Sequence, residues 1–506
     1  MEQNVIEITL NKAGFEYDIH SLVKAFYPEC EVRVHAEGEG EPGSSSDGYP
    51  DLSLQIGEEE IVLVLIQAGG GSSSFHAKKV VISDAPDRTE VKNRLKKLIY
   101  VALSEYTGKQ LPWGTLTGIR PTKIPMTMLL EGRNEEEILS YMKDTYLVSE
   151  EKAGLSLEIA EREKELLSTI HYQDGYSLYI GIPFCPTTCL YCSFMSFPIV
   201  SWKKRVSEYL EAVEKEITFT AEIYKDKVLD TVYIGGGTPT TLSAEELERL
   251  LSFLKKTLDF SQVKEFTVEA GRADSITADK LEVLIKYGVT RISVNPQTMK
   301  EETLRLIGRQ HTVEQVKEAF YLAREKGFTN INMDLILGLP GEDEEDVRRT
   351  IEEVKKLNPD SLTVHSLAIK RASRLNQWIE ENGIEALHNT DETMKIAENG
   401  AREMGMVPYY LYRQKNMSGN FENVGYAREG RFGIYNILIM EERTDIIGIG
   451  AGSSSKLIRR EGDSDPVTGE MITGTRIDRV ENCKSVDDYI ARIDEMIDRK
   501  KQAFAK

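Results

Sequence analysis

Six short segments rich in β-branched and aromatic residues occur between residues 177 and 366, and a stretch with helical periodicity separates each from the next. Strands that alternate with helices pair in parallel, because each helix returns the chain to the start of the next strand. The pattern therefore predicts an α/β protein built on a partial (βα)6 barrel. The predicted strands are residues 177–182, 229–235, 265–270, 291–295, 331–336 and 361–366.

The segments between these strands carry signals for the start and end of helices. Ser243 with Glu246, and Thr312 with Gln315, have the spacing of a capping box, in which two side chains satisfy free N–H groups at a helix start. Gly288 follows a helical stretch at a position where glycine commonly ends a helix. These signals support the alternation of strands and helices.

The loop after the first predicted strand carries Cys185, Cys189 and Cys192 in a C-x3-C-x2-C spacing. Three thiolates on one short loop can bind three irons of a 4Fe–4S cluster and leave the fourth iron open for chemistry. A zinc knuckle is the alternative, but structural zinc sites usually take four ligands. The remaining cysteines, Cys30 and Cys483, are isolated in sequence. The three clustered cysteines are therefore the predicted metal ligands.

Other distinctive residues follow the predicted strands. In a parallel barrel the loops after the strands emerge at one face, which holds the functional site. We expect the following residues to meet there: Gly236, Gly237 and Thr238 in a GGGTP turn, Glu269 at the end of the third strand, Gln297 after the fourth, Asp334 within the fifth and Ala368 after the sixth.

Each of these residues also has a purely structural interpretation. The GGGTP turn, in which glycines leave backbone polar groups open to a ligand, could instead be a tight strand-to-helix turn. Gln297 and Arg309 could be ordinary polar surface residues, and His365 a hydrogen-bonded residue of the barrel. Asp334 lies among apolar residues, where a carboxylate needs a partner.

Length and pattern predict several domains for the 506 residues. We expect an N-terminal α/β domain over residues 1–110, a helical connector over 111–172, the barrel core over 173–370, and a C-terminal capping and substrate region over 371–506. The connector begins with the motif WGTLTGIRPTK, whose Arg120 and Lys123 could face a carboxylate-bearing substrate or could belong to a packed turn.

Composition limits the location and the partners of the chain. The net charge of -20 argues against nucleic acid as the main partner, because phosphate binding needs clustered Lys and Arg. The longest aliphatic run, residues 61–66, is too short to cross a membrane, and the N-terminal residues show no secretory pattern. With few cysteines, three of them clustered, we expect a cytoplasmic protein in a reducing compartment.

Together these motifs resemble those of the radical S-adenosylmethionine (SAM) oxygen-independent coproporphyrinogen III oxidase (dehydrogenase) family. The resemblance extends from about residue 175 to 460 through the cysteine loop, GGGTP, VEAGR, SVNPQ, NMDLILGLPGE and GIGAG. The LTGIRPTK motif and residues 411–426, LYRQKNMSGNFENVGY, are similar to the HemZ-type members in particular.

The resemblance implies a 4Fe–4S cluster and two SAM molecules as cofactors. Positions that match contacts to the first SAM are Tyr179, Gly236 and Glu269, with Ser454 in GIGAGSSSK as a further match. Positions that match contacts to the second are Tyr191, Gly237, Thr238, Gln297, Arg309, Asp334 and Ala368. The resemblance identifies no general acid or base.

The implied reaction is the oxidative decarboxylation of coproporphyrinogen III to protoporphyrinogen IX in haem biosynthesis. In this family a 5′-deoxyadenosyl radical takes a hydrogen atom from a propionate, and loss of carbon dioxide and one electron leaves a vinyl group. The chemistry is anaerobic. The implied partners are a tetrapyrrole substrate and a low-potential electron donor of the flavodoxin or ferredoxin type, with no nucleic acid and no membrane span.

Two departures from the family pattern leave alternatives open. Decarboxylating members have a fourth cysteine where this chain has Phe194, which questions the reaction but not the cluster. Related haem chaperones share that phenylalanine, but residues 434–441 lack their haem-binding motif, and no histidine follows His388. The alternatives are another radical SAM tetrapyrrole enzyme, such as a haem methyltransferase or ring-opening enzyme, and a non-catalytic haem chaperone.

Overall fold

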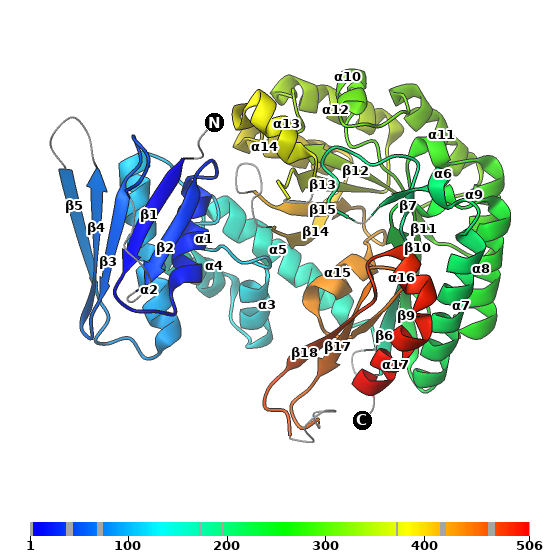
Figure 1. Cartoon of the computed structure of the whole chain (residues 1–506), viewed down its shortest axis with the longest axis horizontal. Helices are drawn as coiled ribbons and strands as arrows, with labels where there is room; N and C mark the ends of the chain where they lie inside the picture. Colours follow the sequence, from blue (N-terminus) through cyan, green and yellow to red (C-terminus); the bar gives the residue numbers. More distant parts are fainter. Residues whose placement is uncertain are drawn as a thin grey trace. The chain divides into compact units, whose positions relative to one another are not determined.

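The computed structural model describes residues 4–36, 44–67, 74–171, 174–194, 196–370, 373–414, 421–463 and 471–504. The chain forms two compact units, shown together in Figure 1. The smaller unit comprises Met1–Glu161, Trp378–Ile384 and Leu411–Glu422. The larger comprises Arg162–Gln377, Glu385–Tyr410 and Asn423–Lys506. The finer division into four parts stays a prediction.

The smaller unit begins with a five-stranded sheet in the order β2-β1-β3-β4-β5. Its strands are β1 (Val5–Leu10), β2 (Glu31–Ala36), β3 (Asp51–Ile56), β4 (Glu60–Gln67) and β5 (Ser74–Val81). β1 runs parallel to β2 and β3, and β3, β4 and β5 are antiparallel neighbours. Alternate side chains form one apolar core with helices α1 (Glu16–Phe26) and α2 (Arg88–Thr107).

Three helices follow this sheet: α3 (Lys123–Leu130), α4 (Glu135–Tyr146) and α5 (Glu150–Leu167). α4 begins at a capping box in which Asn134 and Glu137 each accept a backbone N–H of the other residue. α4 ends at Leu147, which has a left-handed φ of 56°. The expected helical connector is therefore largely helical.

The two stretches that carry the HemZ resemblance meet in the smaller unit. Trp113 is fully buried, and its indole N–H donates to Glu422 over 2.7 Å. The backbone N–H of Arg413 donates to Ile119 O over 2.8 Å, and its guanidinium lies 5.6 Å from the centre of the Trp113 ring. Lys152 pairs with Glu422 over 2.8 Å. Residues 415–420 lie outside the described residues.

The larger unit contains an eleven-stranded sheet in the order β14-β15-β13-β12-β11-β10-β9-β6-β16-β17-β18. The six predicted strands are confirmed and are neighbours in chain order, all parallel. They are β6 (Gly175–Ile182), β9 (Val228–Gly236), β10 (Glu265–Gly271), β11 (Arg291–Val294), β12 (Ile331–Leu337) and β13 (Ser361–Ser366). Because β14 and β18 are the two ends of the sheet, the barrel is partial, as the sequence predicts.

A seventh parallel strand joins the array on the side of β6. This strand, β16 (Asp445–Ile449), pairs with β6 so that Gly448 lies opposite Tyr179. The remaining strands of this sheet are antiparallel to their neighbours where pairing is described: β14 (Val407–Tyr412), β15 (Asn423–Ala427), β17 (Ser454–Arg459) and β18 (Arg476–Glu481). The loop after β16 therefore emerges at the same edge as the cysteine loop after β6.

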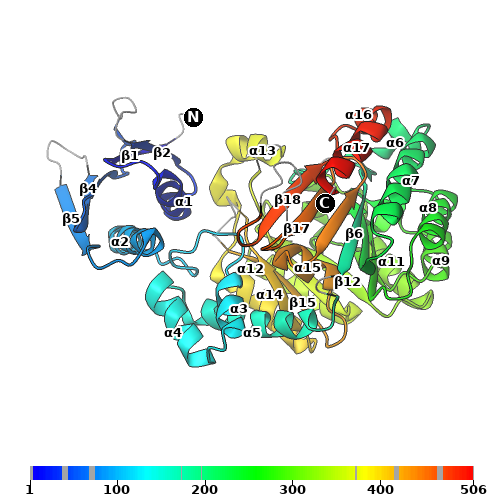
Figure 2. The same cartoon turned by 90° about the horizontal axis from the view of Figure 1, so that it is seen from below.

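Helices connect the parallel strands and form the outer layer of the larger unit, drawn in green in Figures 1 and 2. They are α7 (Val206–Ile223), α8 (Ala244–Thr257), α9 (Ala278–Lys286), α10 (Glu301–Leu306), α11 (Val313–Glu325) and α12 (Glu344–Leu357). The predicted capping boxes at Ser243 and Thr312 are both present, and Gly288 has a positive φ just after α9.

Shorter elements complete this unit. The helices are α6 (Ile199–Trp202), α14 (Asp391–Glu403), α15 (Ile434–Glu441), α16 (Val486–Ala491) and α17 (Ile493–Phe504), while α13 (Leu375–Asn382) belongs mostly to the smaller unit. A small parallel pair, β7 (Phe184–Cys185) and β8 (Phe197–Pro198), flanks the cysteine loop, and single 3-10 turns lie at Pro239–Thr241, Ala273–Ser275 and Ile384–Ala386. No helix within the described ranges is long and apolar enough to span a bilayer.

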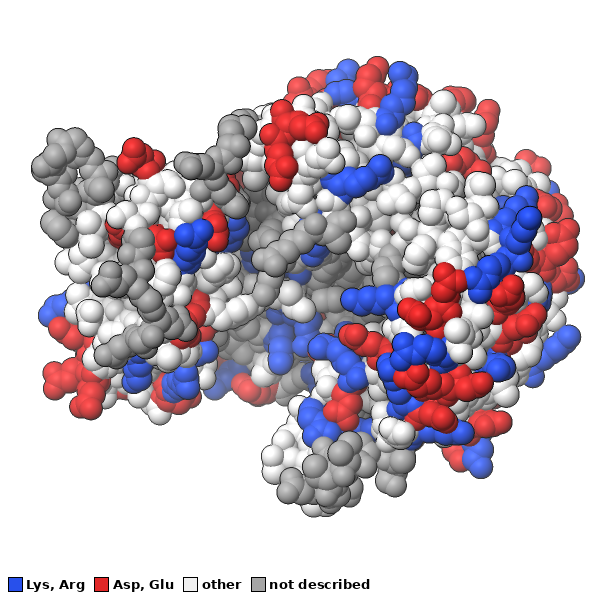
Figure 3. Space-filling model, viewed as in Figure 1, with Lys and Arg blue, Asp and Glu red and all other residues white. Residues whose placement is uncertain are grey.

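The C-terminal helices are held by a buried ion pair. Glu216 of α7 and Lys500 of α17 are both fully buried and pair with each other. Glu216 also accepts hydrogen bonds from Tyr489 over 2.6 Å, from Asn482 over 2.8 Å and from the backbone of Gly450 over 2.9 Å. On the outer surface of α16 and α17, basic and acidic side chains are interspersed (Figure 3).

The parallel strands present different side chains on their two faces. One set of alternate positions is buried and apolar and faces the helix layer: Leu178, Ile180, Val232, Ile234, Phe266, Val268, Ile292, Val294, Met333, Leu335, Leu362 and Val364. The other set is polar: Ser177, Thr231, Glu265, Thr267, Arg291, Ser293, Asn332, Asp334, Ser361 and Thr363. On the polar face, Glu265 accepts the N–H groups of Ile434 and Tyr435 at the start of α15. The inside of the partial barrel therefore carries polar side chains together with the rings of Tyr179 and Tyr233, which occupy the same set of alternate positions.

Candidate functional site

The cysteine loop is fixed by hydrogen bonds to segments distant in sequence. Thr187 donates to Gly308 O over 2.9 Å, and the backbone N–H of Leu190 donates to Ile307 O over 2.9 Å. Arg272, which is 3 % exposed, donates to the Thr187 hydroxyl over 2.7 Å. Arg374 donates to the carbonyl of Thr188. None of these supporting residues was among the predicted site residues, although Arg272 is the last residue of the VEAGR motif.

All three predicted ligands lie half-buried on this loop. Burial raises the pKa of Cys185 to about 11, although the Thr238 hydroxyl donates to its sulfur over 3.5 Å. Burial also raises the pKa of Cys192. Thiols in such surroundings stay protonated until a metal replaces the proton, so the loop suits metal ligation better than free nucleophilic chemistry.

The three sulfurs are not gathered around one point. Within the described residues, no three His, Cys, Asp or Glu side chains converge where a single metal ion could bind. In a 4Fe–4S cluster each thiolate binds a different iron, so its sulfurs stand apart rather than around one ion. The guanidinium of Arg309 adds a hydrogen bond to Cys189.

The glycine turn lies directly against the start of the cysteine loop. The N–H of Gly237 donates to Ile182 O over 2.8 Å, and that of Thr238 donates to Phe184 O over 2.7 Å. A Cβ on Gly237 would lie 2.6 Å from Phe184 O, and Gly236 has a φ of +105°. Both glycines are therefore required by the fold itself, so the structural interpretation of this turn holds whatever ligand it binds.

Glu269 lies near the end of β10, within a group of tyrosines. Tyr233 donates to its carboxylate, and the rings of Tyr179, Tyr233 and Tyr435 stack, with centroids 4.6 Å apart for Tyr233 and Tyr435 and 6.1 Å for Tyr179 and Tyr233. Burial, reinforced by the negative charge of Asp334, raises the pKa of Glu269 to about 7. Glu269 thus changes charge near neutral pH unless a cation binds beside it.

Asp334 has the partner that its apolar sequence surroundings require. The side-chain amide of Asn332 donates to Asp334 over 2.7 Å, and Asn332 accepts from Ser361 over 3.0 Å. Fully buried Arg291 donates to the same Ser361 over 3.1 Å. Burial lowers the pKa of His365, which agrees with the interpretation of this residue as a structural member of the barrel.

Gln297 adopts an unusual backbone conformation after β11. Its φ is +69°, which is costly for a residue with a side chain, and its backbone bonds with Asp334 O and Ile336 N, each over 2.9 Å, hold it there. Its side chain is 8 % exposed. Gln297 is therefore a buried residue held beside Asp334, not an ordinary surface residue.

Arg309 is also buried, at 6 % exposure. Its guanidinium donates to Asn295 O and, over 3.4 Å, to the hydroxyl of Tyr191 between the second and third cysteines. Burial raises the pKa of Tyr191 and keeps the phenol neutral. Arg309 thus links the loop after β11 to the cysteine loop.

Ser454 and Ala368 lie at the ends of this edge. Tyr209 donates to Gly181 O over 2.6 Å and accepts from the N–H of Ala451 over 3.1 Å, which joins the GIGAG turn before Ser454 to the end of β6. Ala368 is half-buried two residues after β13. The structure brings the residues of the predicted site to one edge of the parallel sheet.

Several buried polar atoms at this edge have no hydrogen-bond partner among the described residues. They are Ser293 Oγ, Asn295 Oδ1, Gln297 Oε1, Arg309 Nε and Ser454 Oγ. An unsatisfied buried polar group costs about 1–3 kcal/mol, so a cluster of them indicates a ligand that carries donors and acceptors. The ammonium, carboxylate and ribose hydroxyls of SAM match this mixed set.

Comparison with known proteins agrees with this geometry. The chain matches the Radical SAM superfamily over residues 179–354. It is 42% identical over 453 residues to the oxygen-independent coproporphyrinogen-III oxidase-like protein HemZ of Bacillus subtilis, and the match covers 88% of each chain. The chain belongs to the HemZ family of radical SAM proteins. This family implies a 4Fe–4S cluster and SAM as its cofactors.

Other relatives of the HemZ family share only part of the chain. The haem chaperone HemW of Bacillus subtilis is 40% identical over 195 residues, which are 38% of this chain and 51% of HemW. The oxygen-independent coproporphyrinogen III oxidase of Salmonella typhimurium is 34% identical over 192 residues, or 38% of this chain and 42% of that enzyme. The structure of coproporphyrinogen III oxidase (HemN) from Escherichia coli aligns with a TM-score of 0.50 and 24% identity, covering 66% of this chain and 72% of HemN. That likeness shows the radical SAM fold.

Proposed function

We propose that this HemZ-family chain is a radical SAM enzyme that converts coproporphyrinogen III to protoporphyrinogen IX by oxidative decarboxylation. The observation that carries the proposal is the 42% identity over 88% of the chain to a relative named for its likeness to coproporphyrinogen-III oxidase. A match of this extent includes the regions on both sides of the barrel, where a substrate would be selected.

In this proposal the cluster is held by Cys185, Cys189 and Cys192. Arg309 beside Cys189 offsets the negative charge of the thiolates, and Arg272 and Arg374 hold the loop between them. Together the cluster and SAM supply a carbon radical that can take a hydrogen atom from an unactivated C–H bond.

The glycine turn and Glu269 would bind the amino-acid end and the ribose of SAM. Glu269 has to be a carboxylate to attract an ammonium group, and a bound ammonium would lower its pKa from about 7. Tyr179, Gly236 and Ser454 would complete this first site. A second SAM would contact Tyr191, Gly237, Thr238, Gln297, Arg309, Asp334 and Ala368, several of which hold unsatisfied polar atoms.

Water exclusion would come from the aromatic residues on the inner face. The stacked rings of Tyr179, Tyr233 and Tyr435 and the start of α15 fill the inside of the sheet beneath the proposed site. A dry floor would protect a carbon radical from side reactions. A low-potential flavodoxin or ferredoxin would supply the electrons.

A haem chaperone is the second candidate function. It is favoured by Phe194, which stands where decarboxylating relatives have a fourth cysteine and which is 75% exposed. The 40% identity to HemW over 38% of this chain agrees with this candidate. An exposed aromatic ring beside the cysteine loop suits contact with a flat macrocycle.

One anaerobic assay separates these functions. The chain is reconstituted with iron and sulfide, and reductant, SAM and coproporphyrinogen III are added before 5′-deoxyadenosine and the tetrapyrrole masses are measured. Coupled formation of 5′-deoxyadenosine and protoporphyrinogen IX, lost in Cys192→Ala, is the expected result. A tetrapyrrole that gains a methyl group would instead indicate a methyltransferase. Stoichiometric haem binding without substrate-dependent 5′-deoxyadenosine would indicate a chaperone.

A further inference from the structure

A groove lies between α3 and α4 of the smaller unit, apart from the residues of the proposed SAM sites. Its volume is about 710 Å³, within the range of about 300–1,000 Å³ that is typical of small-molecule sites. Side chains four residues apart on each helix line it, so one face of α3 looks across to one face of α4. The groove is thus formed by residues 120–146 alone.

The wall of the groove is apolar and partly aromatic. Ile124 and Met128 line it from α3, and Tyr141 and Tyr146 line it from α4. The two tyrosine rings meet edge to face, with centroids 5.7 Å apart. Burial, with a smaller effect of Tyr141, raises the pKa of Tyr146 to about 12, so its phenol stays neutral and does not repel an anion. This wall suits a flat apolar ring.

Positive charge lies at the end of the groove where α3 begins. Arg120 and Lys123 stand there, and Lys123 has no ion pair with any described residue. The two helices are joined by residues 131–134, and Tyr141 and Tyr146 of α4 line the same groove as these cations. Away from this end, Arg133 and Glu137 pair over 3.5 Å, and Glu131 adds one further carboxylate, so the lining as a whole carries three cations and two carboxylates.

The sequence motif that precedes α3 fixes this end of the groove. A Cβ on Gly114 would lie 2.1 Å from Tyr146 O, so only glycine lets the motif approach the end of α4. The N–H of Thr115 then donates to the same carbonyl over 2.8 Å. These contacts hold the start of the motif against Tyr146, which gives the motif a structural role as well.

We propose that this groove is an accessory binding site for a flat apolar molecule with carboxylate side chains, the chemistry of a porphyrin with propionates. The apolar wall would hold the ring, and Arg120 and Lys123 would hold the carboxylates. Only the choice of a tetrapyrrole rests on the proposed function; the groove and its charges do not.

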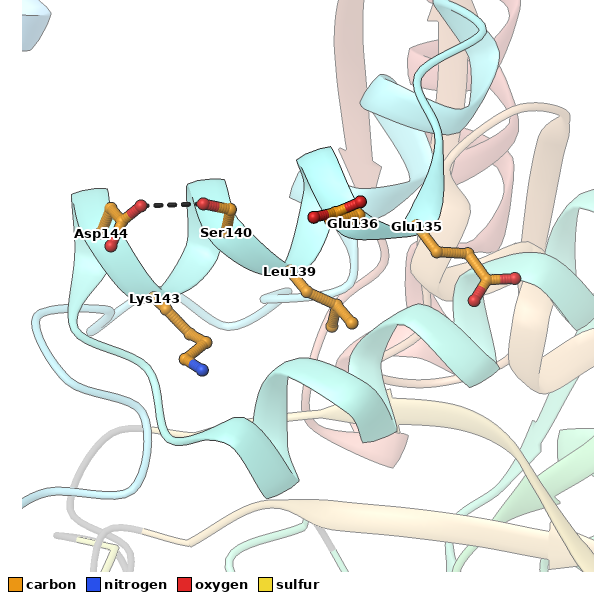
Figure 4. Close-up of a pocket in the computed structure, with 6 residues that line it drawn as sticks. All are labelled: Glu135, Glu136, Leu139, Ser140, Lys143 and Asp144. Atoms are coloured by element: carbon orange, nitrogen blue, oxygen red, sulfur yellow. Dashed lines mark hydrogen bonds between the residues drawn. The ribbon is translucent and has the colours of Figure 1, made fainter.

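The opposite face of α4 offers a contrast on the same helix. There a hollow of about 500 Å³ is lined by Glu135, Glu136, Leu139, Ser140, Lys143 and Asp144 (Figure 4). Ser140 donates to Asp144 over 2.8 Å, and three carboxylates outnumber the single lysine. The excess of carboxylates here would repel a propionate, whereas cations outnumber carboxylates in the groove, so this hollow serves as the internal control.

The test measures binding to the full-length, cluster-loaded chain without reductant, so that no turnover occurs. Coproporphyrin III, followed by its absorbance and fluorescence, is the probe, and its tetramethyl ester is the matched probe without charge. Lys123→Glu should raise the dissociation constant for one bound equivalent of coproporphyrin III by roughly tenfold or more, because the charge at this position then repels the propionates instead of attracting them. Arg120→Gln should weaken the same equivalent.

Two controls make the result decisive. Lys143→Ala removes an exposed cation from the other face of α4 and should leave the affinity unchanged, and the ester should bind all variants equally weakly. Hydrogen exchange should slow in peptides from residues 123–146 when coproporphyrin III is added. Unchanged affinity and stoichiometry in both Lys123→Glu and Arg120→Gln would overturn the site. The proposed function would fail separately, through absence of protoporphyrinogen IX in the turnover assay.

Discussion

The sheet of the smaller unit and the inner face of the parallel sheet are both covered by other elements, yet their side chains differ in kind. In the smaller unit the covered face carries Ile6, Ile8, Leu52 and Leu54, which pack with α1 and α2 into one apolar cluster. In the larger unit the inner face carries Glu265, Arg291, Asn332 and other polar residues. The same alternation of side chains along a strand thus places apolar residues on the covered face of one sheet and polar residues on the inner face of the other.

The difference shows which sheet face is shaped by folding alone. An apolar face is stabilised by about 25 cal/mol for each Å² removed from water and needs nothing else. A polar face gains less, because each buried group needs a partner, and at the edge after β11 some atoms have none among the described residues. Folding alone therefore does not satisfy all the polar groups of this face.

The largest effect is expected for a cysteine of the predicted cluster. Cys189→Ala should abolish cluster binding and reduce 5′-deoxyadenosine formation by more than about 100-fold, since even an outer contact to a metal site is worth about 10–100-fold. Iron analysis and the product assay measure both. Cys483→Ala, which changes a half-buried thiol in the same unit, is the control and should leave iron content intact. Equal iron in both variants would remove Cys189 from the metal site.

A core substitution in the smaller unit should affect stability but not the site. Leu54→Ala removes a fully buried side chain from the apolar cluster and should lower the free energy of unfolding of this unit by about 2–5 kcal/mol. Hydrogen exchange of the amides in α1 and α2 reports this change, while iron content should stay the same. A parallel fall in iron content would show that the metal site depends on the apolar core of the smaller unit.

Glu269→Gln should alter the pH dependence of stability in the larger unit. The pKa of Glu269 is raised to about 7, so the native state holds a proton that the unfolded state releases near pH 4.5. The stability contributed by that proton is fully present below pH 4.5 and is lost as pH rises to about 7, by up to about 3 kcal/mol. The difference in unfolding free energy between wild type and Glu269→Gln should therefore decrease over this window in urea melts.

Added SAM gives the matching test of the role of Glu269. If Glu269 binds the ammonium, SAM should stabilise the wild type more at pH 8 than at pH 6, because only the carboxylate attracts a cation. The Glu269→Gln variant should show no such pH dependence. A stabilisation by SAM that is independent of pH in the wild type would argue against this contact.

The smallest effect is expected at the position of the absent fourth cysteine. Phe194 is 75% exposed, so Phe194→Cys should change stability by less than about 0.5 kcal/mol. Iron content should also stay the same, because three thiolates suffice for the cluster in this proposal. Thermal melts and iron analysis of the variant check this, and product analysis shows whether the thiol alters the reaction. A gain of iron would show that three cysteines hold the cluster incompletely.

Much of the fold could be predicted because its signals are local. Runs such as residues 229–235 and 331–336 have the composition of buried strands, and the capping residues Ser243 and Thr312 mark helix starts within a few positions. Strand β16 was not among the predicted strands. It has only five residues, and it joins the sheet by pairing with β6, more than 250 residues earlier in the sequence. Such a partnership leaves no local pattern.

Some residues of the candidate site could likewise be predicted from local sequence, and others could not. Cys185 stands out because two further cysteines lie close to it in sequence. Glu269 and Asp334 stand out because they are charged residues whose immediate sequence neighbours are apolar. The contacts of Arg272, in the VEAGR motif, and of Arg374 with the cysteine loop could not be predicted, because each arginine is more than 80 positions away from that loop in sequence. Tyr233 left a weak signal, as it stands on the same strand face as its stacking partner Tyr179 on the neighbouring strand.

The pairing of β16 with β6 has a practical consequence for shortened forms of the chain. A chain that ends before Asp445 would keep the six predicted parallel strands. β6 would then become an edge strand with a row of free N–H and C=O groups. That edge would be open to pairing with other chains, and it leads directly into the cysteine loop. Expression of the isolated core is therefore expected to yield aggregates, whereas fragments that retain residues 445–449 and the helices that hold them should stay monodisperse.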